Sequence, residues 1–290
     1  MFLSLIVPLL AAIALAVAVT TFHRRLPPVL AAHAVAVTVI VVAAAAVPTF
    51  WIVGLGYLAH APFFGSGLRW CVEVFGTHDR ISPWIGPPSL VLAGFGTMQS
   101  VRVVRAHRRL RHDHAGSVEI ACHEQPFAFT LPGRGGHVVL SSGLVDLLDD
   151  DEQRVVLAHE RAHARHRHDR YLLVARLASA AIPMLRPLAS RLQFSLERCA
   201  DEAAVEECGD RRFVARTLGK VALHGVTPVG ALGFAGLGVP ARVAALLSAP
   251  APRPRWSLLV GLWLAIAATG ALGAFQIHHL TSLVTALCPG

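Results

Sequence analysis

The sequence that decides the fold is Val155-Val-Leu-Ala-His-Glu-Arg-Ala-His-Ala-Arg165, which carries His159, Glu160 and His163 in the pattern H-E-x-x-H. Residues four apart lie on one face of a helix, so the two histidines can direct their imidazoles at one metal ion. Glu160 follows the first histidine and can act as a carboxylate base beside that ion. The pattern predicts a zinc peptidase. The alternative is a solvated basic helix with chance spacing.

The flanking residues predict that this stretch is helical. Acidic residues precede it, where a helix N-terminus favours negative charge, and Asp150 with Gln153 predicts a capping box. A cationic run from Arg165 to Arg170 lies toward the C-terminal end, as the helix dipole favours. The motif therefore lies in the helical context that such a zinc site requires.

A second motif, Glu197-Arg-Cys-Ala-Asp201, supplies what the first one lacks. A catalytic zinc takes three protein ligands and keeps one position open, and Glu197 offers the third ligand from a second helix. Asp201 lies one turn later and can accept a hydrogen bond from the outer nitrogen of a ligating histidine. Cys199 is the rival ligand, but it lies roughly 200° around the helix from Glu197. We therefore favour Glu197.

Four segments together resemble the gluzincin membrane proteases, over about Phe127 to Ala204. Two families of that kind fit: the antirepressor-type penicillin-sensor and methicillin-resistance signal transducers, and the prenyl-protein-processing and heat-shock membrane proteases. The segments are Phe127-Ala-Phe-Thr-Leu-Pro-Gly133, Val138-Val-Leu-Ser-Ser-Gly-Leu144, Val155 to His163, and Glu197-x-x-Ala-Asp201.

The resemblance implies one zinc ion and a role for each motif residue. It makes His159, His163 and Glu197 the zinc ligands, Glu160 the general base and Asp201 a hydrogen-bond partner of a ligand. Pro240-Ala-Arg242-Val243 also resembles the segment in the prenyl-protein proteases where an arginine helps the site. The histidine expected before it is missing, so Arg242 is a weaker candidate. No oxyanion-stabilising residue is assigned.

The composition is that of a membrane protein. Of 290 residues, 54% are hydrophobic and only 15% are charged, and the mean hydropathy is +0.55. The first uncharged run has no positive charge before it, which favours an uncleaved span over a signal peptide. The four runs that predict spans are Phe2 to Phe22, Val29 to Leu58, Ile81 to Val101, and the stretch from Trp256.

The arginines set the predicted orientation. Arg24 and Arg25 mark the first loop as cytoplasmic, and the cluster from Arg102 to Arg111 marks the end of the third span as cytoplasmic. The predicted divisions are 1–101 with three spans, a cytoplasmic peptidase domain at 102–255, and a last span and tail at 256–290. The same basic cluster, with a pI near 10.2, could suggest nucleic acid, but no nucleic-acid motif accompanies it.

Other segments carry smaller predictions. Val138 to Ser141 predicts a strand after a glycine-rich turn, either a substrate-binding edge or a structural hairpin. Tyr171 to Ser190 is apolar, yet we expect no crossing there because His163 and Glu197 must reach one metal ion. His166, His168 and His224 are expected at the surface.

The five cysteines follow the predicted topology. Cys71 and Cys288 fall outside and either pair or stay as thiols, while Cys122, Cys199 and Cys208 are expected to be reduced.

The sequence therefore predicts a mainly α, multi-pass cell-membrane protein with a cytoplasmic gluzincin-like domain that carries a small β-hairpin or sheet. The predicted function is a zinc-dependent endopeptidase that cleaves a cytoplasmic regulator or repressor in signal transduction. Its partners are the bilayer and a protein substrate, with no direct nucleic acid. The alternatives are a membrane-protein quality-control protease and a non-catalytic metal-binding receptor or scaffold. Glu160 favours an enzyme, because a metal holder has no need of a base.

Overall fold

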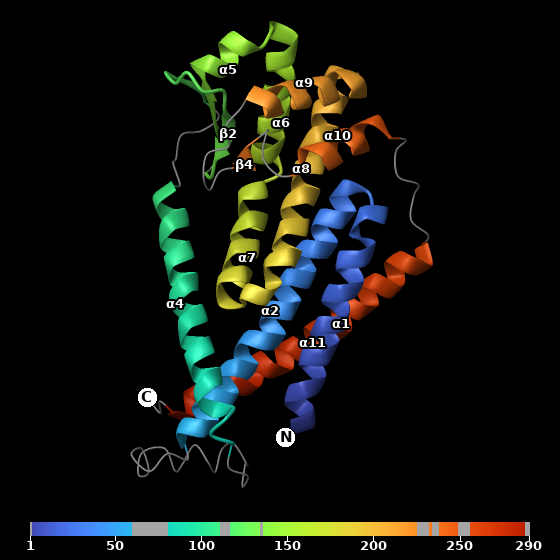
Figure 1. Ribbon diagram of the computed structural model, residues 1–290. Helices are drawn as coiled ribbons and strands as arrows, with labels where there is room; N and C mark the ends of the chain where they lie inside the picture. The colour runs from blue at the N-terminus through green and yellow to red at the C-terminus, as the bar shows by residue number, and fades with distance from the viewer. Residues whose placement is uncertain are drawn as a thin grey trace.

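The computed structural model describes residues 2–59, 81–110, 117–133, 136–224, 232–233, 238–248 and 256–287, and it confirms a mainly helical protein with a small sheet. Long helices form the lower part of the molecule in Figure 1: α1 (Phe2–Phe22), α2 (Pro28–Ala59), α4 (Gly86–Leu110) and α11 (Trp256–Leu287). A smaller head lies above them and contains the sheet with α5 (Ser142–Leu147), α6 (Asp150–Arg165), α9 (Arg211–His224) and α10 (Val239–Leu247). Cys71 and Cys288 lie outside the described residues.

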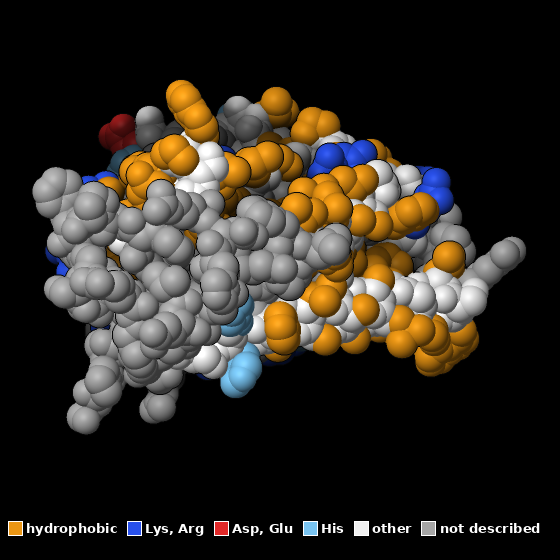
Figure 2. All heavy atoms as spheres, turned by 90° about the horizontal axis from the view of Figure 1, so that it is seen from below, with side chains coloured by type: hydrophobic (Ala, Val, Ile, Leu, Met, Phe, Trp, Pro, Cys, Tyr) orange, Lys and Arg blue, Asp and Glu red, His pale blue; other side chains and the backbone are white. Residues whose placement is uncertain are grey.

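Three helices are long and apolar enough to cross a membrane: Ile6–Arg25, Pro28–Leu58 and Trp256–Ser282. The predicted span from Ile81 to Val101 overlaps α4, which begins only at Gly86, carries arginines in its second half and is not among them. That span stays a prediction. Much of the described surface seen from below is nonetheless apolar (Figure 2), and α4 contributes exposed Val91, Leu92 and Phe95 to the apolar surface of the molecule.

The sheet has the strand order β1-β3-β2-β4, with β1 (Val118–Ala121), β2 (Ala128–Leu131), β3 (His137–Ser141) and β4 (Leu232–Gly233). The prediction of a strand at Val138 to Ser141 is confirmed, but its use as a substrate-binding edge is wrong. β3 pairs in parallel with β1 and antiparallel with β2, so both of its edges are already occupied. Gly136 precedes it with φ +67°, and a Cβ there would lie 2.1 Å from that of Ala164 on α6.

Helix α6 begins with a capping box one residue earlier than predicted. The Asp149 side chain accepts a hydrogen bond from the backbone N–H of Glu152, and the Glu152 side chain accepts one from the backbone N–H of Asp149. Asp150 is therefore the first helical residue rather than the cap. The apolar side of α6 is buried through Val155 and Val156.

A helical hairpin links the two metal motifs. It consists of α7 (His168–Ala181), a 3-10 turn at Pro183–Leu185, and α8 (Arg186–Cys208), and it runs down beside α2 and α4 before turning back (Figure 1). The chain therefore returns instead of crossing between His163 and Glu197. Gly96 of α4 allows the close approach, since a Cβ there would lie 2.6 Å from the carbonyl oxygen of Ala181. Residues of the hairpin share one core with α1 and α2: Leu15, Val35, Val39, Ala175, Leu188 and Leu192.

Candidate metal centre

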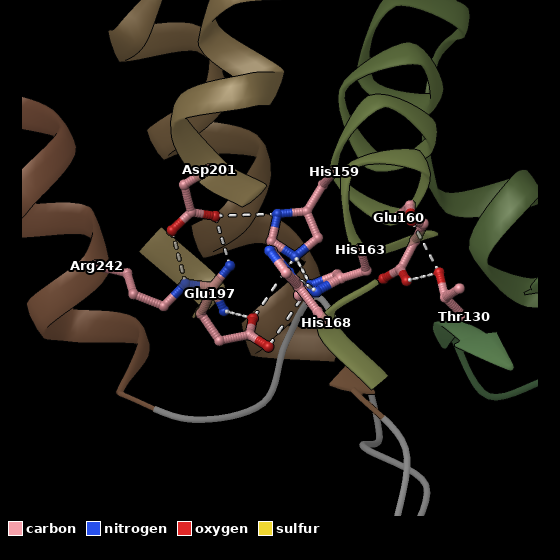
Figure 3. Close-up of polar contacts among 8 residues, drawn as sticks. All are labelled: Thr130, His159, Glu160, His163, His168, Glu197, Asp201 and Arg242. Atoms are coloured by element: carbon pink, nitrogen blue, oxygen red, sulfur yellow. Dashed lines mark hydrogen bonds and ion pairs between the residues drawn. The ribbon is translucent and has the colours of Figure 1, made fainter. Parts of the chain in front are cut away.

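The residues of the two motifs meet between α6 and α8. The i,i+4 spacing on α6 directs His159 and His163 to the same side, and Glu197 on α8 faces them (Figure 3). All three side chains are buried, at 2% exposure or less. Among the described residues they are the one group of histidine, cysteine or carboxylate side chains whose ligand atoms converge closely enough to hold a metal ion.

The spacing of the ligand atoms fits a tetrahedral metal ion. Nε2 of His159 lies 3.1 Å from Nε2 of His163, and the two nitrogens lie 3.5 Å and 3.7 Å from the Glu197 carboxylate oxygens. Zinc ligands at their usual bond lengths of ~2.1 Å lie roughly 3.4 Å apart in a tetrahedron. Glu197 Oε1 is buried without a hydrogen-bond partner in the described part of the chain, as expected of an atom reserved for a cation.

Asp201 orients the first histidine. Its Oδ1 lies 3.2 Å from Nδ1 of His159, which leaves Nε2 directed at the metal position (Figure 3). Burial alone would lower the pKa of His159, but Asp201 and then Glu197 raise it to about 9. Binding of a metal ion would therefore displace a proton from this imidazole.

Arg242 of α10 joins the site from the far side of α8. Its guanidinium donates from Nε and Nη2 to the two oxygens of Asp201, at 2.8 Å and 2.5 Å, and its Nη1 lies 2.8 Å from Glu197 Oε2. Burial on its own would raise the pKa of Asp201, but Arg242 holds it at about 2. A residue that the sequence marked as a weaker candidate is thus fully buried against two site carboxylates.

Glu160 lies against the sheet, on the opposite side of the three ligand residues from Arg242. Thr130 of β2 contacts its Oε2 at 2.8 Å and its backbone oxygen at 2.9 Å, so the hydroxyl can donate to either oxygen. The other oxygen, Oε1, is buried with no hydrogen-bond partner among the residues described. Burial raises the pKa of Glu160 to about 7, which suits a group that takes and returns a proton near neutral pH.

His168 corrects the prediction of a surface histidine. It is only 3% exposed, and its Nδ1 lies 2.7 Å from Nδ1 of His163. His166 and His224 are exposed as expected. Burial lowers the pKa of His168 to about 3, so the imidazole is neutral.

Cys199 is not part of the ligand group. It lines a separate cavity of about 310 Å³ together with His168 and Tyr171 of α7 and His33 of α2. Burial raises the pKa of its thiol to about 12, whereas a zinc ligand must be a thiolate. This placement agrees with the roughly 200° that separates Cys199 from Glu197 around the helix.

Sequence reasoning missed Thr130 and His168. The Thr130 hydroxyl reaches Glu160 across 30 positions of the chain, and no local pattern predicts such a contact. His168 lies five residues after His163, so in one continuous helix it would point away from the metal. The helix ends at Arg165, however, and a new one begins at His168.

Comparison with known proteins supports the same chemistry. Residues 101–189 match the model of peptidase family M48, a stretch that holds the H-E-x-x-H motif but ends before Glu197. The protease HtpX homolog of Aquifex aeolicus (strain VF5) is 41% identical over 76 residues, which are 25% of this chain and 24% of that protein. The chain thus matches about a quarter of that relative's length. No solved structure matches the chain.

These matches support a membrane-associated metallopeptidase of the M48 kind. Neither of them is to a penicillin-sensor or methicillin-resistance signal transducer, so that finer resemblance stays a prediction.

Proposed function

We propose that the protein is an integral membrane zinc-dependent endopeptidase. The observation that carries the proposal is the convergence of His159, His163 and Glu197 at tetrahedral spacing. Beside them lies the carboxyl group of Glu160, whose pKa burial raises to about 7. The partial M48 match supports the same activity. Zinc bound by this triad would supply the Lewis acidity that polarises a peptide carbonyl and acidifies water.

The chain's own residues divide the remaining work. Glu160 takes a proton from the attacking water and returns one to the leaving amine, as its pKa near 7 permits. Thr130 holds one oxygen of that carboxylate and leaves the other free to act. Asp201 orients His159, and Arg242 orients both Asp201 and Glu197. A non-catalytic receptor or scaffold would have no use for a base poised in this way.

The substrate we propose is a cytoplasmic regulator or transcriptional repressor, as in the antirepressor-type family that the motifs resemble. A quality-control protease acting on membrane proteins is the second candidate. The packing of the hairpin of α7 and α8 against α2, a helix long and apolar enough to span a membrane, favours it. Both candidates need the same catalytic residues and differ only in the protein that reaches them.

Zinc content tests the ligand set. The purified wild-type protein should hold one zinc per chain, and Glu197→Ala should lose most of it because two imidazoles alone bind weakly. Cys199→Ala is the matched control on the same helix and should keep its zinc, since Cys199 is outside the ligand group. Metal analysis after dialysis gives both values. Equal zinc in wild type and Glu197→Ala would remove Glu197 from the site.

Thiol labelling tests the proposed cytoplasmic orientation of the catalytic domain. Cys122 is exposed, so a membrane-impermeant maleimide should miss it in intact cells and label it after permeabilisation. Cys71 or Cys288 should be labelled in intact cells unless the two are paired. Strong labelling of Cys122 from outside would invert the topology, and with it the choice of a cytoplasmic substrate.

A further inference from the structure

The two metal-binding histidines are supported in different ways. His159 has the ionised carboxylate of Asp201 at its outer nitrogen, whereas His163 has another imidazole, that of His168. The two rings lie edge to face, with centroids 4.8 Å apart and planes at 76°. Of the residues that the structure describes, His168 is the one that forms a hydrogen bond with His163 Nδ1.

The hydrogen bond has one direction when the site is loaded. A ligating histidine binds through a nitrogen lone pair, and Nε2 of His163 is the nitrogen that faces His159 and Glu197. Its proton must then lie on Nδ1, which donates to Nδ1 of His168. His168 accepts through Nδ1 and therefore carries its own proton on Nε2. The contact fixes the tautomer of both rings.

The backbone holds His168 in this position by an unusual turn. Arg167 has φ 54° and ψ 42°, the one non-glycine residue with positive φ among those described. A left-handed residue that is not glycine is strained and tends to mark functional sites. Here the left-handed residue separates α6 from α7, and the first side chain of α7, that of His168, points back at His163.

A second contact anchors the same end of α7. One turn after His168, the Tyr171 hydroxyl donates to Nε2 of His33 at 3.1 Å. His33 in turn donates from Nδ1 to the carbonyl of Val29, at 2.7 Å, in the first turn of α2. The start of α7 is therefore fixed between the metal helix and a membrane-type helix.

We infer that His168 is a positioning residue for the metal centre: it accepts the Nδ1–H of His163 through its own Nδ1 and so aims His163 Nε2 at the zinc. The inference rests on the proposed function only in requiring that His163 binds a metal. His163 is then supported by the neutral imidazole of His168, whereas His159 is supported by the carboxylate of Asp201.

The test measures zinc affinity in the full chain, purified in detergent, by competition with a chromogenic chelator. His168→Ala should bind zinc about 10–100-fold more weakly, the usual effect of removing such a partner. His168→Asn places an amide oxygen where Nδ1 lies and should restore the affinity, whereas His168→Gln reaches to the position of Nε2 and should not. His166→Ala removes the neighbouring exposed imidazole and should match wild type.

Each result decides the matter. Wild-type affinity in His168→Ala, or equal affinity in the Asn and Gln variants, overturns the inference, because the nitrogen that accepts would then be irrelevant. If His168→Ala fails to fold, the Asn and Gln pair still decides, since both fill the space. A wild-type protein that binds no zinc would overturn the proposed function instead, so the two failures are distinguishable.

Discussion

Glu160→Gln should bind zinc as wild type does and lose peptide cleavage by about 10²–10⁴-fold, the usual contribution of general acid–base catalysis. That loss corresponds to roughly 3–5 kcal/mol of barrier. Glutamine keeps the shape of the side chain and can still accept the hydrogen bond from Thr130, but it cannot take a proton. The three ligands are untouched, so the metal centre should persist.

The measurement requires the same preparation for both proteins, with zinc determined on each sample and a peptide or protein that wild type cuts. Thermal unfolding should show that Glu160→Gln is no less stable, because burial disfavours the charged carboxylate that it replaces. Cleavage at the wild-type rate with full zinc would show that Glu160 is not the base. A scaffold would show no functional difference between the two proteins.

Of the variants proposed for this protein, Arg242→Met should cause the largest loss of stability. The substitution leaves Asp201 and Glu197 as two buried carboxylates without their cation, which typically costs about 3–5 kcal/mol. Metal-free protein should suffer more than zinc-loaded protein, because the metal itself supplies positive charge beside Glu197. Thermal unfolding in detergent with and without zinc measures both effects.

Two further variants separate charge from packing. Asp201→Asn combined with Arg242→Met removes one of the stranded charges, so the double variant should be more stable than Arg242→Met alone. Arg211→Met is the matched control, since Arg211 also forms a bidentate pair, with Glu202, but a partly exposed one worth about 1 kcal/mol or less. Equal losses at both arginines would show that burial of Arg242 contributes nothing special.

The sequence was sufficient for what depends on local spacing. The 3.6-residue period of α6 and α8 places His159 beside His163 and Glu197 beside Asp201, and charge patterns located the start of α6 to within one residue. The return of the chain between the motifs also followed, from the need of both to reach one ion. Apolar runs located the helices that can span a membrane.

What the sequence could not predict depends on tertiary contacts. Whether Val138 to Ser141 lies at an edge depends on where β1 and β2 dock, and both dock against it. The burial of His168 depends on a left-handed turn at an arginine, a residue type without preference for that conformation. Arg242 lies 41 residues from its partner Asp201, and only the packing of α10 on α8 brings them together.

The return of the chain through Pro183–Leu185 has a consequence for assembly. The strands, α6 and the second half of α8 carry the residues of the site, but the hairpin of α7 and α8 packs its apolar face on α2. Leu188 and Leu192 are buried in a core that α1 and α2 complete, while the packing of α8 on α6 sets the distance from Glu197 to the histidines. Assembly of the metal centre should therefore depend on α2, because the helix that carries Glu197 packs on both α2 and α6.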